Sequence, residues 1–253
     1  MRWTERDGLQ WLEFAIFDSS PGFGHASLTR KGGFSPPPYD SLNFSVSVGD
    51  SKENVIRNRL IVQKVLNLKR LVTLQQCHGT HIALIEKEQE GVILSCDGAI
   101  LIHPGCAVLI THADCQPVLI YDPVHHVGAA LHAGWRGLTQ GMLERGVRRL
   151  SELCGSCPEE LLVAIGPSLG AGAEFKNYRV EFPEAFWPFR EGTCYFDLHR
   201  ISRWQLEECG VQAANIEISP LATDREPELF FSFRRASAAK EATGRGGTFC
   251  WLR

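Results

Sequence analysis

Short apolar runs separated by turn residues fill the middle of this chain of 253 residues. Runs of this length, bounded by Gly, Pro, Asn or Asp, are typical of buried strands. They predict strands over residues 70–75, 82–85, 99–102, 107–111, 118–121, 127–132 and 161–165, and a late strand over 229–235. Since only a turn separates some neighbouring runs, antiparallel hairpins are expected among these strands.

Three longer segments have apolar residues at helical spacing. The first covers residues 52–65, where Ser51 stands in the position of an N-terminal cap. The second covers residues 138–154 and the third covers residues 198–209. Helices interleaved with strands predict a mixed sheet flanked by helices. No linker-like stretch divides the chain, so residues 1–253 are expected to form one domain.

The composition is that of an ordinary globular protein, with 44% hydrophobic and 22% charged residues and a net charge of -3. It gives no reason to expect nucleic acid or a membrane as a partner. No apolar run approaches the roughly 18 to 20 residues that span a bilayer. The N-terminus lacks a signal-type apolar stretch, so a cytoplasmic location is expected. The 9 cysteines are expected to be mostly reduced.

Three short segments carry residues that bind metal ions. They are Gln-Cys-His-Gly at 76–79, Ala-Asp-Cys-Gln-Pro-Val at 113–118 and His-Ala-Gly-Trp-Arg-Gly at 132–137, and they contribute His78, Cys115 and His132. Each of these ligands lies at or near the end of a predicted strand, where α/β folds gather functional groups. One Cys and two His can hold zinc and leave its fourth position open, as in catalytic sites. The sequence therefore favours an enzyme.

The same residues permit a second chemistry. Cys115 could act as a thiolate nucleophile paired with His132 or His78, as in cysteine hydrolases. Zinc would instead hold the thiolate as a ligand, and the spacing of the segments does not decide between the two. His81 and His112 are weaker candidates, either to orient a ligand or to replace one.

Taken together, these segments resemble the YfiH-type laccase-domain family, also called the multicopper polyphenol oxidoreductase family or DUF152. The resemblance extends over almost the whole chain and rests above all on the segments at 113–118 and 132–137. Further matching segments lie at 29–35, 41–44, 48–50, 58–59, 76–79, 97–99, 165–170, 196–198, 231–235 and 244–245. The resemblance implies an α/β (α+β) class fold, a single-domain three-layer α/β/α arrangement with a mixed β-sheet that is CNF1/YfiH-like.

The resemblance also implies an activity. It implies zinc, with copper possible, held by His78, Cys115 and His132, in a purine nucleoside phosphorylase acting on adenosine, inosine, guanosine and methylthioadenosine. Adenosine deamination is implied as well, by a monomer or homodimer whose partners are the nucleoside and phosphate. One alternative is a hydrolase of peptidoglycan precursors, an amidase that edits UDP-MurNAc carrying a wrong amino acid. Another is a laccase-like copper polyphenol oxidase, which the 9 scattered histidines disfavour.

Substrate contacts are expected from residues close to the matching segments. Arg59 and Arg136 are candidates for phosphate binding, because a guanidinium group matches phosphate bidentately. Arg136 could instead pair with Asp114. Asp114 could orient a histidine ligand or transfer protons, or it could cap a turn. Arg30 and Asn43 belong to matching segments near the N-terminus and are expected to line the pocket.

The chain departs from the family pattern at two places. Cys77 stands where the family usually has Val, directly before His78. Because successive side chains of an extended chain point to opposite faces, Cys77 is predicted to be a buried packing residue and not a fourth ligand. The stretch 219–223 lacks the Cys that the family often carries there, which leaves the zinc site unchanged.

Overall fold

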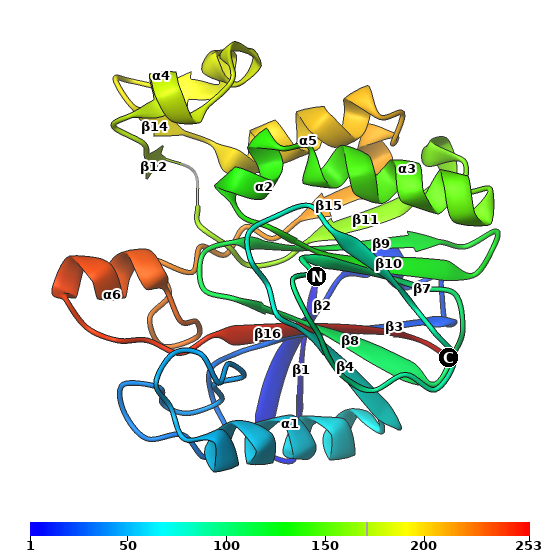
Figure 1. The fold of residues 1–253 in the computed structure, drawn as a ribbon, viewed down its shortest axis with the longest axis vertical. Coiled ribbons are helices and arrows are strands. Elements are labelled where there is room, and N and C mark those ends of the chain that lie inside the picture. Colours follow the sequence, from blue (N-terminus) through cyan, green and yellow to red (C-terminus); the bar gives the residue numbers. More distant parts are fainter. Residues whose placement is uncertain (171) are drawn as a thin grey trace.

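Two β-sheets lie face to face in this structure, a computed structural model that describes residues 1–170 and 172–253 (Figure 1). The seven-stranded sheet has the order β1 (Arg2–Arg6), β2 (Leu9–Glu13), β3 (Phe23–Leu28), β16 (Gly246–Leu252), β8 (Cys106–His112), β4 (Arg70–Leu74) and β6 (Gly91–Ile93). The six-stranded sheet has the order β15 (Ile216–Ile218), β11 (Leu162–Ile165), β9 (Gln116–Asp122), β10 (Val127–Ala133), β7 (Gly98–Leu101) and β5 (Ile82–Ile85). Both sheets combine parallel and antiparallel pairs.

Helices cover the two outer faces of this pair of sheets (Figure 1). Helix α1 (Lys52–Leu66) lies under the seven-stranded sheet, whereas α3 (Met142–Cys154) and α5 (Leu198–Glu208) lie over the six-stranded sheet. The other helices are α2 (Trp135–Thr139), α4 (Tyr178–Glu181) and α6 (Phe233–Ala239). A small sheet has the order β12 (Ala173–Glu174), β14 (Tyr195–Phe196) and β13 (Arg190–Glu191). Short 3-10 turns lie at Ala15–Phe17, Pro158–Glu160, Glu184–Phe189 and Ala213–Asn215. No helix among the described residues is both long enough and apolar enough to cross a membrane.

Three apolar layers hold these elements together. Val108 and Leu119 belong to the layer between the two sheets. Val62 of α1 packs with Phe249 outside the seven-stranded sheet, and residues such as Val147 of α3 pack outside the six-stranded sheet.

The predicted α/β class with mixed sheets is confirmed, but the predicted number of layers is corrected. The structure has two stacked sheets and thus four layers, because β1, β2, β3 and β16 form a large part of a second sheet.

The predicted strands between residues 70 and 165 are confirmed to within two residues at each end, and so are the helices α1 and α5. The predicted helix over 138–154 is broken in two, because Gly141 has a φ of 75° between α2 and α3. The predicted strand over 229–235 is wrong. Ser232 there accepts a hydrogen bond from the Arg235 amide and starts helix α6. The single domain over residues 1–253 stays a prediction.

Candidate metal centre

The structure brings His78, Cys115 and His132 together, with one ligand atom of each within 4.8 Å of the others. Cys115 directly precedes β9 and His132 is the next-to-last residue of β10, and these strands pair with His132 opposite Pro117. His78 follows β4 of the other sheet. The centre therefore forms where strand ends of the two sheets meet.

The backbone around the three side chains leaves space for their convergence. His78 has a φ of 60°, a left-handed conformation that is uncommon outside Gly. Gly134 lies against the centre, and a Cβ atom there would be 2.8 Å from the Cys115 Sγ and 3.3 Å from the His78 ring. His132 is buried, Cys115 is partly buried and His78 is exposed, so the centre is accessible from the His78 side. A thiolate with two imidazoles and an accessible side fits a zinc ion that keeps an open position.

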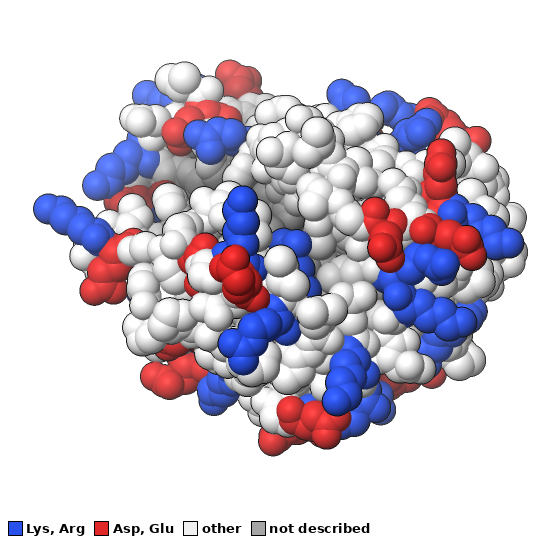
Figure 2. All heavy atoms as spheres, turned by 60° about the horizontal axis from the view of Figure 1, so that its bottom comes forward, with Lys and Arg blue, Asp and Glu red and all other residues white. Residues whose placement is uncertain are grey.

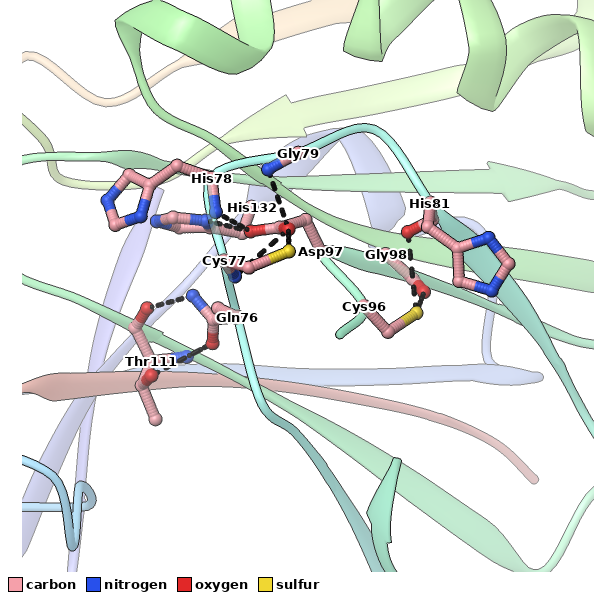
Figure 3. A network of polar contacts seen from close by, with 10 residues as sticks. All are labelled: Gln76, Cys77, His78, Gly79, His81, Cys96, Asp97, Gly98, Thr111 and His132. Carbon is pink, nitrogen blue, oxygen red and sulfur yellow. Dashed lines mark hydrogen bonds and ion pairs between the residues drawn. The ribbon is translucent and has the colours of Figure 1, made fainter. Parts of the chain in front are cut away.

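Asp97 holds two of the three candidate ligands in place (Figure 3). This fully buried carboxylate accepts hydrogen bonds from the backbone amides of Cys77, His78 and Gly79 at 3.1, 2.9 and 2.8 Å. It also accepts a bond of 2.9 Å from the Nδ1 of His132. Because Nδ1 is engaged with Asp97, the Nε2 of His132 is the nitrogen left for a metal ion.

The turn between β4 and His78 is fastened by two further side chains (Figure 3). Gln76 donates from Nε2 to the carbonyl of Thr111 at 2.7 Å and accepts from the Thr111 amide at 2.8 Å. The Cys77 thiol lies 3.1 Å from Asp97 Oδ2. The prediction of a buried Cys77 is wrong, since this residue is exposed. The left-handed turn at His78 replaces the extended chain on which that prediction depended.

In the metal-free centre, Cys115 and His132 stabilise each other's charged forms. Burial alone would raise the pKa of the Cys115 thiol, but the charge and hydrogen bond of His132, with help from His78, lower it to about 6. Burial alone would lower the pKa of His132, but the Cys115 thiolate and the Asp97 carboxylate raise it to about 9. Between these values the pair is a thiolate and an imidazolium ion.

This pairing predicts that metal binding releases a proton. A metal ion needs the thiolate and a neutral imidazole, so at pH 7.5 the proton of His132 must leave, about one per ion bound. The number of protons released should fall as the pH rises through the pKa of His132, and should rise as the pH falls through the pKa of the Cys115 thiol. Titration calorimetry with zinc in buffers of different ionisation enthalpy measures this number. Zinc binding without proton release at pH 7.5 would contradict the assignment of charges.

A cavity of about 830 Å³ opens beside the centre and is lined by all three candidate ligands. In Figure 2 a hollow with Lys and Arg side chains beside it is visible near the centre of the face shown. Four arginines line the cavity, namely Arg59, Arg136, Arg234 and Arg245. Among the described residues, none of the four forms an ion pair with a carboxylate. The cavity therefore suits an anionic ligand.

Asp114 is the only acidic residue among the described residues that line the cavity, and its carboxylate is already engaged. It accepts a hydrogen bond of 2.7 Å from the Thr223 hydroxyl and one of 2.6 Å from the backbone amide of Arg234, which lies in the first turn of α6. Asp114 thus caps a helix. The residue that orients a candidate histidine ligand, His132, is Asp97 and not Asp114. The alternative pair between Asp114 and Arg136 is not formed, and the Arg136 guanidinium lies 4.3 Å from the centre of the Trp135 ring.

The other predicted substrate contacts lie in different places. Arg59 lines the cavity and donates to the carbonyl of Phe44 at 2.7 Å, whereas Arg30 pairs with Asp40 at 3.1 Å outside it. Asn43 is fully buried, accepts from the Arg245 amide at 2.9 Å and does not line the cavity. The expectation that Arg30 and Asn43 line the pocket is therefore corrected: they hold the neighbouring loops.

The two weaker histidine candidates also separate. His112 lines the cavity but lies outside the ligand cluster, and its Nε2 is 2.9 Å from the Thr248 hydroxyl. Burial lowers the pKa of His112 to about 3, which keeps the ring neutral. His81 neither lines the cavity nor belongs to the cluster, and its carbonyl accepts from the amide of Asp97 at 3.0 Å.

Comparisons with known proteins agree with this architecture. Residues 24–253 match the family model described as multi-copper polyphenol oxidoreductase laccase. Purine nucleoside phosphorylase YfiH from Shigella flexneri is 34% identical over 91% of this chain and 94% of its own length. A purine nucleoside phosphorylase from Streptomyces coelicolor is 34% identical over 93% of this chain and 98% of its own length. The crystal structure of YlmD from Geobacillus stearothermophilus superposes with a TM-score of 0.89 at 29% identity and covers 99% of this chain and 98% of its own.

Proposed function

Since this chain belongs to the multi-copper polyphenol oxidoreductase laccase family, we propose that it is a zinc-dependent purine nucleoside phosphorylase. The observation that carries the proposal is the cluster of His78, Cys115 and His132 in a cavity with four arginines. Its proposed substrates are adenosine, inosine, guanosine and methylthioadenosine, and adenosine deamination is a second proposed activity. We place the enzyme in the cytoplasm, as a monomer or homodimer.

In phosphorolysis a phosphate oxygen bonds to C1′ of the ribose while the bond from C1′ to the base breaks, and the base leaves with a proton. A zinc ion held by His78, Cys115 and His132 would supply Lewis acidity that polarises an oxygen. The chain's own residues bind and orient the reactants. Asp97 fixes His132 by its Nδ1, and Asp114 fixes the first turn of α6, whose Arg234 lines the cavity.

Arginines are the proposed phosphate ligands. Arg59 and Arg245 are partly buried, and burial lowers the pKa of both guanidinium groups. A partly buried guanidinium group that forms no ion pair gains most from an anionic ligand. Arg136 remains a candidate, although it is exposed and stacked on Trp135.

The proposed phosphate contacts predict a separation of kinetic constants. Arg59→Gln and Arg245→Gln are each expected to raise the KM for phosphate about tenfold or more, because each removes a charge-assisted hydrogen bond. The KM for the nucleoside should change little. Arg136→Gln is expected to have a smaller effect on phosphate. Initial rates at varied phosphate and saturating inosine measure this, and equal effects on both substrates would contradict the assignment.

The proposal is tested by metal analysis of the purified protein and by chromatography of adenosine incubated with and without phosphate. About one zinc per chain, with adenine formed only when phosphate is present, is the expected result. Inosine formed without phosphate would support the deaminase activity. Zinc without any turnover of purines would favour the amidase that edits peptidoglycan precursors, and turnover by metal-free protein would favour Cys115 as a nucleophile.

The family description also names copper and a laccase, and copper can bind the same ligands tightly. Laccase chemistry needs a blue-copper site and a separate copper cluster. Among the described residues, only one group of three or more His, Cys, Asp or Glu side chains is arranged to hold a metal ion. We therefore rank the polyphenol oxidase below the phosphorylase.

A further inference from the structure

One wall of the cavity contains a buried amide that is only partly hydrogen-bonded. Gln116 follows the candidate ligand Cys115, lines the cavity and is 1% exposed. Its Oε1 lies 2.6 Å from the Oγ of Ser202, a fully buried residue of α5. Its Nε2 is buried and donates to none of the described residues. Because an unpaired buried amide N–H is unfavourable, a ligand in the cavity that accepts from this atom would gain affinity.

The surroundings of this amide suit a flat heterocycle. Trp135, Leu169, Phe175 and Leu198 line the same cavity and pack in or against one apolar cluster. The rings of Trp135 and Phe175 are 6.0 Å apart at an interplanar angle of 68°. Aromatic and aliphatic side chains with a few convergent polar groups are typical of a site that stacks a base and fixes its orientation.

The hydroxyl group of Ser202 allows the amide to adopt two orientations. This hydroxyl has one proton but lies near two acceptors, Gln116 Oε1 at 2.6 Å and the carbonyl oxygen of Leu198 at 2.9 Å. When the proton goes to Gln116, the amide N–H remains for a ligand that accepts. When it goes to Leu198, a rotated amide donates to the hydroxyl oxygen, and the carbonyl of Gln116 remains for a ligand that donates.

We propose that Gln116 contacts position 6 of the purine base and that the Gln116–Ser202 pair lets one site accept both 6-oxo and 6-amino purines. The oxygen of a 6-oxo purine accepts from the amide N–H, and the amine of a 6-amino purine donates to the rotated carbonyl. This inference rests on the proposed function, because it takes purine nucleosides as the ligands.

The test is calorimetric binding of inosine and of methylthioadenosine, a 6-amino purine nucleoside for which no deamination is proposed, to the intact protein at pH 8 in the absence of phosphate. Gln116→Met keeps the length of the side chain but removes both polar atoms, so it should weaken both nucleosides about tenfold or more. Gln116→Glu, ionised at pH 8, leaves an acceptor only, so it should weaken inosine binding and shift the affinity ratio about tenfold toward methylthioadenosine.

Gln205→Met is the matched control. Gln205 lies on α5, as Ser202 does, and donates to the Leu138 carbonyl at 2.9 Å. Its Oε1 is buried and has no partner among the described residues, but Gln205 does not line the cavity. Its replacement should leave both affinities unchanged. If the wild-type protein binds both nucleosides and Gln116→Glu leaves the ratio of the two affinities unchanged, this inference is overturned, but the proposed function is not. Wild-type protein that binds neither nucleoside would overturn the proposed function, and the inference with it.

Discussion

Replacing Cys115 or His132 by alanine is expected to remove the bound metal and to lower phosphorolysis by about a thousandfold, the equivalent of several kcal/mol of transition-state stabilisation. The reason is that the two remaining ligands, which come from different segments, are too few to keep the ion bound. The fold should survive, because the apolar layers that pack the two sheets do not depend on these side chains. Metal analysis, far-UV circular dichroism and steady-state rates measure the three expectations.

Cys154→Ala is the matched control for this experiment. Cys154 is partly buried like Cys115, but it lies at the end of α3, outside the ligand cluster and the cavity. Its replacement should leave metal content and rate unchanged. If the apo form of Cys115→Ala is unfolded, the site is a structural one, because a structural zinc site contributes its binding energy to folding.

The role of Cys115 can be decided by a second measurement on the same proteins. Protein loaded with cobalt(II) should show a charge-transfer band from the thiolate to the metal, which is absent in Cys115→Ala. A thiolate held in this way is a ligand and has lost most of its nucleophilicity. If Cys115→Ala retains its metal but loses all activity, and no such band is seen in the parent protein, then Cys115 acts as the nucleophile.

Local patterns in the sequence predicted those parts of the fold in which buried runs follow one another. They missed β1 because most of its side chains are exposed, β3 because Gly24 interrupts it, and β16 because it begins with two Gly residues. The apolar residues Phe230, Phe231 and Phe233 suggested a strand, but Ser232 caps a helix there. In each of these places the outcome depends on packing against distant parts of the chain or on a single cap.

The candidate site shows the same limit. The three candidate ligands could be named from the sequence, because each lies near a strand end in a distinctive segment, and the structure brings them within 4.8 Å of one another. Asp97 could not be assigned its role from spacing, since its partners lie 18 to 20 residues away at Cys77, His78 and Gly79, and 35 residues away at His132. The only local signal is an acidic residue directly before a buried strand. Such a residue acts through contacts that arise only when the two sheets are assembled.

The second large effect is expected at this residue. Asp97→Asn replaces a carboxylate that accepts from three backbone amides and from His132 by an amide with one acceptor atom. The free energy of unfolding should fall by about 3 kcal/mol, since hydrogen bonds to a charged group are lost and an N–H of the new side chain faces other donors. Zinc affinity should fall about 10- to 100-fold, because His132 loses the group that fixes its ring.

Asp122→Asn separates these two effects. Asp122 is also fully buried, and it also anchors a turn and a histidine, since it accepts from the amides of Val124 and His125 and lies 2.8 Å from the His125 Nδ1. That histidine neither belongs to the ligand cluster nor lines the cavity. Asp122→Asn should therefore lose stability as Asp97→Asn does, but keep the zinc affinity of the parent. Equal losses of affinity in both variants would show that the metal centre responds to general loosening of the fold.

The pH dependence of stability gives an independent check on Asp97. Burial alone would raise the pKa of this carboxyl, but hydrogen bonds from His132, the Cys77 thiol and the backbone amides hold it far below its ordinary value. The stabilisation is therefore fully present above the ordinary pKa of an Asp, about 4, and is lost as the pH falls through the lowered value. Urea denaturation of metal-free protein between pH 7 and pH 2 should show a steeper loss of stability for the parent than for Asp97→Asn. Parallel curves would mean that the carboxylate contributes no charge-dependent stability, and that the weaker zinc binding of the variant has another cause.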